Sequence, residues 1–238
     1  MTTTSGQPGP ARSRPGWAAA DAYLFDIDGT LLNVRGGVHY DAFLNAMRDV
    51  FGVSARLEGV PIPGNTDTAI LRAVLRRAGI AEAEIKDRLP LAVRQMSDEV
   101  QAAAHAMRPV VCPSVPDLLA RLRAAGKLLG VVSGNFEAIG WTKLAVSGLR
   151  EFFSFGHFSD HAETRAEIFH QGVAEARRRL GPAAAVCVVG DTPADIAAAR
   201  EVGIAVISVG TGMFPLADLA ALAPDHCAAC CTDLLAAF

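Results

Sequence analysis

The chain has 238 residues, of which 51% are hydrophobic and 20% are charged, and its formal net charge is -3. This length and apolar content allow a sizeable core, in one large domain or a domain with an insert. The mildly acidic balance argues against nucleic acid as a partner, and the apolar runs are too short to span a membrane. The 5 cysteines lack the spacing of a disulfide framework, so we expect a cytoplasmic protein with no membrane partner.

The first part of the chain changes from a polar tail to a buried strand. Residues 1–20 are polar, rich in Gly and Pro, and lack the apolar region of a secretory signal, so we expect a flexible tail. The apolar run 22–25 predicts a buried strand, and Asp26 and Asp28 follow it directly. A turn would explain Asp and Gly here. However, two carboxylates at the end of a buried strand are costly unless their charge is compensated.

Residues 34–108 are predicted to form an all-helical insert, or cap, between the first strand and the rest of the chain. Their Ala, Arg and Leu residues have helical spacing and include no notable strand-like apolar run. We expect one helix over 41–51, a second from Thr66 or Asp67 to residue 78, and one or two more over 81–107. Pro90 is expected to break the last of these helices. The segments 21–33 and 109–238 would then form the core domain.

From residue 109 onward, apolar strands alternate with helices. Strands are predicted over 128–132, 185–189 and 204–209, with a short extended stretch at 152–158. Helices are predicted over 115–125, 136–147, 164–180 and 193–202, each followed by Gly. Continuous apolar strands separated by helices predict an α/β fold, a doubly wound parallel sheet covered on both faces.

Three predicted strands carry polar groups at their carboxyl ends, where doubly wound sheets bind ligands. The first carries Asp26 and Asp28, the second Ser133-Gly134-Asn135, and the third Asp191 and then Asp195. Four converging aspartates with no cation in their own motifs would need raised pKa values or a metal ion. Oxygen ligands with room for water and phosphate indicate Mg²⁺. The residues therefore favour a phosphoryl-transfer site with an aspartate as nucleophile.

The combination D26-I27-D28-G29-T30, S133-G134-N135 and G190-D191-T192-P193-A194-D195 resembles the haloacid dehalogenase superfamily, over roughly residues 20–215. The helical insert after the first motif is similar to the cap of its phosphoglycolate-phosphatase-like and β-phosphoglucomutase-like branches. The resemblance implies roles for the following residues: Asp26 as nucleophile; Asp28 as general acid and base, with its carbonyl on Mg²⁺; Ser133 as a donor to the phosphoryl group; Gly29, Thr30, Gly134 and Asn135 around the phosphate; Asp191 and Asp195 at the metal.

The chain departs from the family at one position, where a lysine usually begins the helix before the third motif. Here Thr164-Arg165-Ala166 stands at that place. Arg165 keeps the positive charge and can contact a carboxylate and a phosphate together, although arginine is not equivalent to lysine. Lys143, in the preceding helix, is a second candidate for this role, and a solvated Arg165 is the structural alternative.

The resemblance implies a phosphomonoester hydrolase acting on a small phosphorylated metabolite, as a monomer or homodimer. A phosphomutase would use the same Asp26 and Asp28 but return the phosphate to a sugar. A dehalogenase is disfavoured because it needs no acid at position 28. A non-catalytic phosphate-binding protein is disfavoured because Asp26, Asp28 and Asp191 are all present.

Two further segments have both a structural and a functional interpretation. The turn Gly64-Asn65-Thr66-Asp67 resembles a cap loop that closes over substrate, but it would also serve as a helix N-cap. The C-terminal His226, Cys227, Cys230 and Cys231 have a spacing that can bind zinc. A packed terminal strand and helix is favoured there, because no second cluster completes a tetrahedral set.

Overall fold

The computed structural model describes every residue except 1–15, 36, 55–56, 58 and 61. Most of the expected N-terminal tail lies outside the described residues. In its described part, Trp17–Ala19 form a 3-10 turn, and the indole of Trp17 stacks on His226 with ring centroids 4.3 Å apart.

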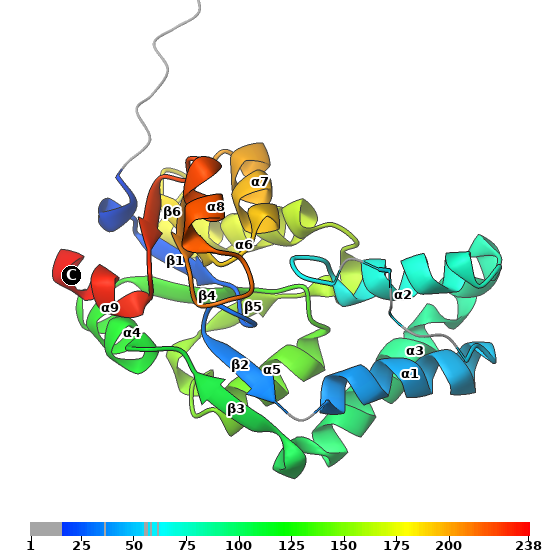
Figure 1. The fold of residues 1–238 in the computed structure, drawn as a ribbon. Coiled ribbons are helices and arrows are strands. Elements are labelled where there is room, and N and C mark those ends of the chain that lie inside the picture. The colour runs from blue at the N-terminus through cyan, green and yellow to red at the C-terminus, as the bar shows by residue number, and fades with distance from the viewer. Residues whose placement is uncertain (1–15, 36, 55–56, 58, 61) are drawn as a thin grey trace, which may run out of the picture.

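A six-stranded parallel sheet forms the centre of the molecule, with the strand order β5-β4-β1-β6-β7-β8 (Figure 1). The strands are β1 (Ala22–Phe25), β4 (Leu128–Val132), β5 (Phe155–His157), β6 (Val186–Gly190), β7 (Ala205–Val209) and β8 (His226–Ala228). The predicted doubly wound α/β fold is confirmed. The added strand β8 contains His226 and Cys227, as the packing interpretation of the C-terminus expected.

Alternate residues of each strand point to opposite faces of the sheet, and different helices cover those faces. Tyr23 and Phe25 share one core with α4 (Val115–Ala124), α5 (Glu137–Val146) and α9 (Cys231–Leu234). Ala22 and Leu24 share the other core with α6 (Arg165–Leu180), α7 (Pro193–Val202) and α8 (Leu216–Ala221). Strands buried on both faces explain the uninterrupted apolar runs of the sequence.

The segment 34–108 contains α1 (Val38–Phe51), α2 (Asp67–Arg77) and α3 (Glu82–Ala102), which lie to one side of the sheet in Figure 1. Their apolar faces form a third core, which includes Phe136 and Ile139 at the start of α5. The segment is not entirely helical, because β2 (Leu32–Arg35) pairs antiparallel with β3 (Arg108–Val111) at its two ends.

Pro90 does not break α3, contrary to the expectation from sequence, and lies inside this single helix. Proline removes the hydrogen bond that its nitrogen would donate to the carbonyl of Lys86. Pro90 and Lys86 are both exposed, so water can hydrate that carbonyl and the helix continues.

None of the helices in the described part of the chain is both long enough and apolar enough to cross a lipid bilayer.

Candidate active site

The loop after β1 places two carboxylates at the carboxyl end of the central strand. The backbone nitrogen of Asp26 donates to the carbonyl of Val189 at 3.0 Å, so Asp26 extends the hydrogen bonding between β1 and β6 by one residue. Gly29 then reverses the chain at a φ of 85°. A Cβ at Gly29 would lie 2.2 Å from Oδ2 of Asp191. Glycine is therefore required both by the backbone angle and by the close approach of the Asp191 carboxylate.

The end of the neighbouring strand β6 supplies the next two acids. Thr192 caps α7, and it forms a capping box in which Thr192 and Asp195 each bind the other's backbone nitrogen. Pro193 occupies the first turn of this helix, where no backbone donor is needed. The cap fixes Asp195, whose Oδ2 accepts a hydrogen bond from the Thr192 hydroxyl at 2.7 Å. Asp191 accepts one from the Thr30 hydroxyl at 2.9 Å.

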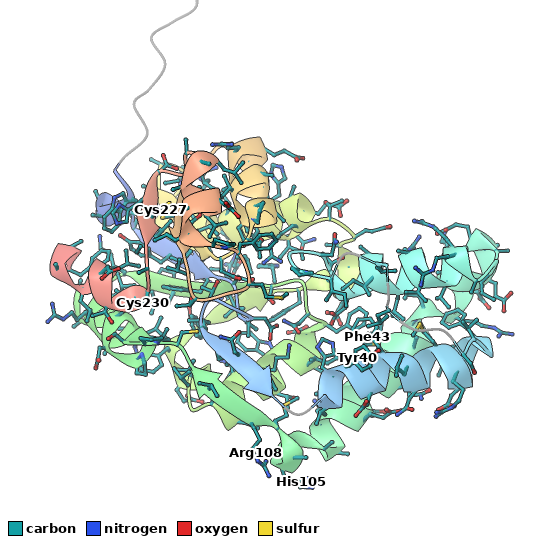
Figure 2. The ribbon with its side chains drawn as sticks, viewed as in Figure 1. Tyr40, Phe43, His105, Arg108, Cys227 and Cys230 are labelled. Atoms are coloured by element: carbon teal, nitrogen blue, oxygen red, sulfur yellow. The ribbon has the colours of Figure 1, made fainter. Side chains whose placement is uncertain are left out.

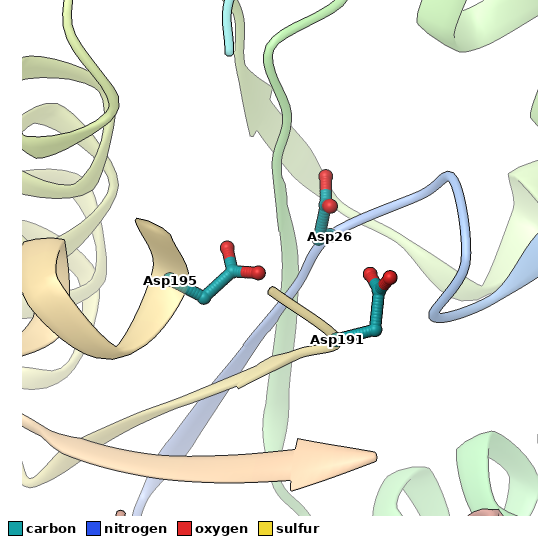
Figure 3. Close-up of side chains that lie close together, drawn as sticks. All are labelled: Asp26, Asp191 and Asp195. Carbon is teal, nitrogen blue, oxygen red and sulfur yellow. The ribbon is translucent and has the colours of Figure 1, made fainter. Parts of the chain in front are cut away.

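Asp26, Asp191 and Asp195 converge at this edge of the sheet (Figure 3), each with a carboxylate oxygen within 4.8 Å of the others. All three are buried. Burial raises the pKa of Asp26 to about 6, with Arg165 opposing the shift and Asp195 and Asp28 adding to it. Burial, with repulsion from Asp26 and Asp195, raises the pKa of Asp191 to about 8. Such a cluster is costly without positive charge, and it can hold a metal ion.

Arg165, the first residue of α6, lies between two of these acids. Its Nε donates to Oδ1 of Asp195 at 2.6 Å, and its Nη2 donates to Oδ2 of Asp26. The capping box of Thr164 and Glu167 starts α6 at this point and thereby places the guanidinium at the sheet edge. Arg165 is 8% exposed, so the solvated alternative is wrong.

Lys143 serves a different carboxylate. Its Nζ donates to Oδ1 and Oδ2 of Asp28 at 2.9 and 2.7 Å, and to Oδ1 of Asn135 at 2.7 Å. Asn135 in turn donates through Nδ2 to Oδ2 of Asp28 and to the Ser133 hydroxyl, both at 2.8 Å. Burial alone would raise the pKa of Asp28, but the charge and hydrogen bonds of Lys143 lower it below the ordinary value. Asp28 is therefore held as an oriented carboxylate.

The turn at residues 64–67 contacts the core directly. The Thr66 hydroxyl accepts from the Ala69 nitrogen at 3.0 Å and donates to the Glu163 carbonyl at 2.7 Å, so this residue caps α2 and also reaches the core. Asp67 donates from its backbone to the Gly134 carbonyl at 2.7 Å and accepts from the Phe136 nitrogen at 2.9 Å. The helix-cap interpretation of this turn is therefore confirmed, and its closure over a substrate stays a prediction.

A cavity of about 410 Å³ lies between the helices α1 and α2 and the carboxyl end of the sheet. At one end it is lined by the predicted residues Asp26, Asp28, Gly29, Ser133, Gly134, Asn135, Arg165 and Asp191, together with Lys143. Thr30 and Asp195 are fully buried behind this lining. The structure therefore brings together every residue that the three motifs indicated.

Sequence reasoning missed the residues that α1 contributes to the cavity. His39 lines the cavity and pairs with Asp67, its Nε2 lying 3.1 Å from Oδ2. Tyr40 and Phe43 also line it. No spacing signal connects residues 39 and 67, because their proximity depends on how α1 packs against α2.

Comparisons with known proteins agree with this geometry. The model of haloacid dehalogenase-like hydrolases matches residues 20–203, and a second model, of HAD-hydrolase-like proteins, matches residues 170–237. The chain is 33% identical to a phosphoglycolate phosphatase of Synechococcus elongatus, over 91% of this chain and 96% of the relative. It is 28% identical to a probable phosphatase, IndB, of Dickeya dadantii, over 85% of this chain and 86% of the relative.

A solved structure of CbbY from Rhodobacter sphaeroides in complex with phosphate has the same fold, with a TM-score of 0.69 at 21% identity. The match covers 92% of this chain and 98% of that one. With the motif residues assembled at one sheet edge and a family model matching most of the sequence, the chain belongs to the haloacid dehalogenase-like hydrolases.

Proposed function

We propose that the chain is a Mg²⁺-dependent phosphomonoester hydrolase that acts on a small organic phosphate through an aspartyl-phosphate at Asp26. The observation that carries this proposal is the position of Asp26. Its carboxylate lies at the floor of the cavity, against Arg165 and beside Asp191 and Asp195. The relatives named as phosphatases support the same activity.

The donor set fits Mg²⁺. Carboxylate oxygens of Asp26 and Asp191 offer the hard ligands that this ion prefers, and few enough of them to leave places for water and phosphate. A Cβ at Gly212 would lie 1.7 Å from Oδ2 of Asp191, so glycine is required there for the Asp191 carboxylate to take this position. Asp195 already has both oxygens engaged, by Arg165 and Thr192. We therefore assign it to positioning Arg165 and α7.

The first half-reaction follows from the contacts of Asp26 and Asp28. Arg165 holds Oδ2 of Asp26, which assigns the attack on phosphorus to Oδ1. The phosphorus–oxygen bond to the alcohol breaks, and the leaving oxygen takes a proton from Asp28, which receives that proton from a substrate bound as its phosphate monoanion. A bound Mg²⁺ would offset the negative charge shared by the phosphoryl group and the carboxylates.

The second half-reaction returns Asp26 to its free state. Asp28, held as a carboxylate by Lys143 and Asn135, takes a proton from water. The water oxygen bonds to phosphorus as the bond from phosphorus to Asp26 breaks, which releases inorganic phosphate. Ser133 and the backbone of Gly134 line the cavity beside this path and would bind the phosphoryl oxygens.

We further propose that the helices α1 to α3 act as a cap over the site and that residues 21–33 and 109–238 form the catalytic core. The contacts of Thr66 and Asp67 with the core support this division. A cap in this position would exclude water from the site until the phosphoryl group has been transferred.

The test is hydrolysis of p-nitrophenyl phosphate with Mg²⁺ and with a chelator, for the wild type, Asp26→Asn and Asp117→Asn. Asp117 is an exposed acid in the first turn of α4 and is the matched control. We expect turnover that needs Mg²⁺, is lost in Asp26→Asn and is unchanged in Asp117→Asn. Acid-quenched wild type should carry phosphate on Asp26. Turnover by Asp26→Asn would contradict the proposal, and a requirement for a sugar bisphosphate would favour the mutase instead.

A further inference from the structure

The end of the cavity opposite the aspartates is apolar. Its lining there comes from α1, from the segment between α1 and α2, and from α2, and we call it the apolar wall: Tyr40, Phe43, Leu57, Ile62 and Ile70. Tyr40 and Phe43 are three residues apart on α1 and therefore share one face of this helix. Figure 2 shows both near its N-terminal end, beside the core. The wall therefore offers apolar and aromatic surface to a ligand bound at Asp26.

Part of this surface is open to solvent. Tyr40 is 42% exposed and Ile62 43%, and Met213, which lines the cavity from the core side after β7, is 80% exposed. Exposed apolar side chains that gather at a cavity are typical of a binding site, because a ligand that covers them removes apolar area from water. The exposure of these three residues therefore indicates a ligand with apolar surface.

The charges of the cavity limit what else the ligand carries. Among the described residues that line it, the basic side chains are Lys143, Arg165 and His39. Each is already paired. Lys143 is paired with Asp28, and His39 with Asp67. Arg165 is paired with both Asp26 and Asp195. A second anionic group on a substrate would find none of these cations free. Burying a carboxylate against the apolar wall without a partner would be costly.

From the apolar wall and these paired cations we infer the substrate class: a phosphate monoester of an uncharged alcohol with an apolar or aromatic portion, not of a hydroxy acid. The inference rests on the proposed function, since it places the phosphoryl group at Asp26. It distinguishes this chain from a relative whose name specifies phosphoglycolate, which carries a carboxylate.

The test compares two esters that differ by one charge, benzyl phosphate and 4-carboxybenzyl phosphate, with phosphoglycolate as a third substrate and Mg²⁺ throughout. We expect kcat/KM for benzyl phosphate to exceed that of either acid at least about tenfold. The variant Tyr40→Arg places a cation at the wall and should raise kcat/KM for 4-carboxybenzyl phosphate relative to benzyl phosphate. Leu91→Arg makes the same change at a 55% exposed leucine of α3 outside the cavity, and should leave the ratio unchanged.

Binding of the matched phosphonates, benzylphosphonate and 4-carboxybenzylphosphonate, separates this inference from the proposed function. If no ester is hydrolysed and Asp26 is not phosphorylated, the proposed function fails. Tighter binding of benzylphosphonate, which lacks the extra carboxylate, would still support the apolar wall as the specificity determinant. Equal or tighter binding of the acid, or a preference for phosphoglycolate in turnover, would overturn the inference while the phosphatase proposal stands.

Discussion

Arg165 compensates charge at the point where the acids of the site crowd together. It contacts Asp26 and Asp195 at once, and all three side chains are buried. A guanidinium can do this because its donors diverge in a plane, whereas an ammonium is a point charge. Arg165 therefore also connects α6 to α7, because Asp195 belongs to α7.

We expect Arg165→Ala to lower kcat roughly 100-fold or more, because the positive charge beside the transferred phosphoryl group is lost. It should also destabilise the fold, by about 3–5 kcal/mol, because buried carboxylates are left without their partner. The kcat and the stability of Arg165→Lys should lie between those of the wild type and Arg165→Ala, since one ammonium cannot bridge both acids. Steady-state kinetics and urea denaturation measure these effects. Near-normal turnover of Arg165→Ala would contradict the role of this residue.

The acids of the site should make the stability of the metal-free protein depend on pH. The pKa of Asp191 is raised from 3.8 to about 8, and that of Asp26 from 3.8 to about 6. Between pH 3.8 and about 8, the folded chain therefore binds more protons than the unfolded chain. Their contribution to stability is therefore greatest at low pH and is lost as pH rises through this window. Melting in a chelator should show that lowering the pH from about 8 to about 5 raises the Tm of the wild type more than that of Asp191→Asn. An equal response of the two proteins would contradict the prediction.

At the level of elements, the sequence indicated most of the sheet and its helices for a physical reason. Strands buried on both faces are continuous apolar runs, and glycine follows several helices, such as Gly181 after α6 and Gly203 after α7. The ribbon β2-β3 gave no such signal. Its strands, LNVR and RPVV, are short and polar in part, and each is a strand only because the other, some 75 residues away, pairs with it.

The site shows the same division between local and distant signals. Asp26, Ser133 and Asp191 follow predicted strands, and parallel strands bring their ends to one edge, so topology alone placed them together. Their partners depend on packing. That Lys143 serves Asp28 and Arg165 serves Asp26 is decided by how α5 and α6 lie on the sheet. The sequence left both cations as candidates for one role.

The effect of Pro90 on the stability of α3 can be tested with a single substitution. It lies in the interior of α3 and leaves one backbone acceptor without its helical donor. We expect Pro90→Ala to raise the free energy of unfolding by about 1–3 kcal/mol, because it restores the hydrogen bond and improves helix propensity. Urea denaturation measures the change. An unchanged or lower midpoint would contradict this prediction.

At the scale of the whole molecule, the site is complete only because the helical segment contacts the core. The Asp67 carboxylate binds the Phe136 nitrogen and the His39 ring, and Thr68 donates to the Ser159 carbonyl at 2.7 Å. Gly64 also approaches the core closely, since a Cβ there would lie 2.8 Å from that of Ala194. If α1 to α3 act as the proposed cap, these contacts hold the apolar wall in place, and a shift of the cap would alter the proposed substrate preference.

Gly134 gives a way to change the cap position without altering any reacting group. A Cβ at this residue would lie 2.5 Å from the Asn65 carbonyl and 3.1 Å from Cα of Thr66, both backbone atoms of the cap turn. Gly134 does not have a positive φ, so alanine there is free of backbone strain and acts by moving the turn away. We expect Gly134→Ala to lower kcat/KM for an aromatic ester at least about tenfold, because a site misplaced by an ångström loses much of its rate.

Small-angle scattering and the melting temperature make this test specific to the cap. Gly134→Ala should show a larger radius of gyration than the wild type in the presence of Mg²⁺ and phosphate, with a melting temperature within a few degrees, since the three cores are not altered. Gly16→Ala, at a described glycine with nothing within 4 Å of its Cβ position, is the control and should match the wild type in all three measurements. If Gly134→Ala instead keeps full activity and the same dimensions, the contact between the turn and the core is not what orders the site. The cap would then act through its packing on α5 alone, where Phe136 and Ile139 join the third core.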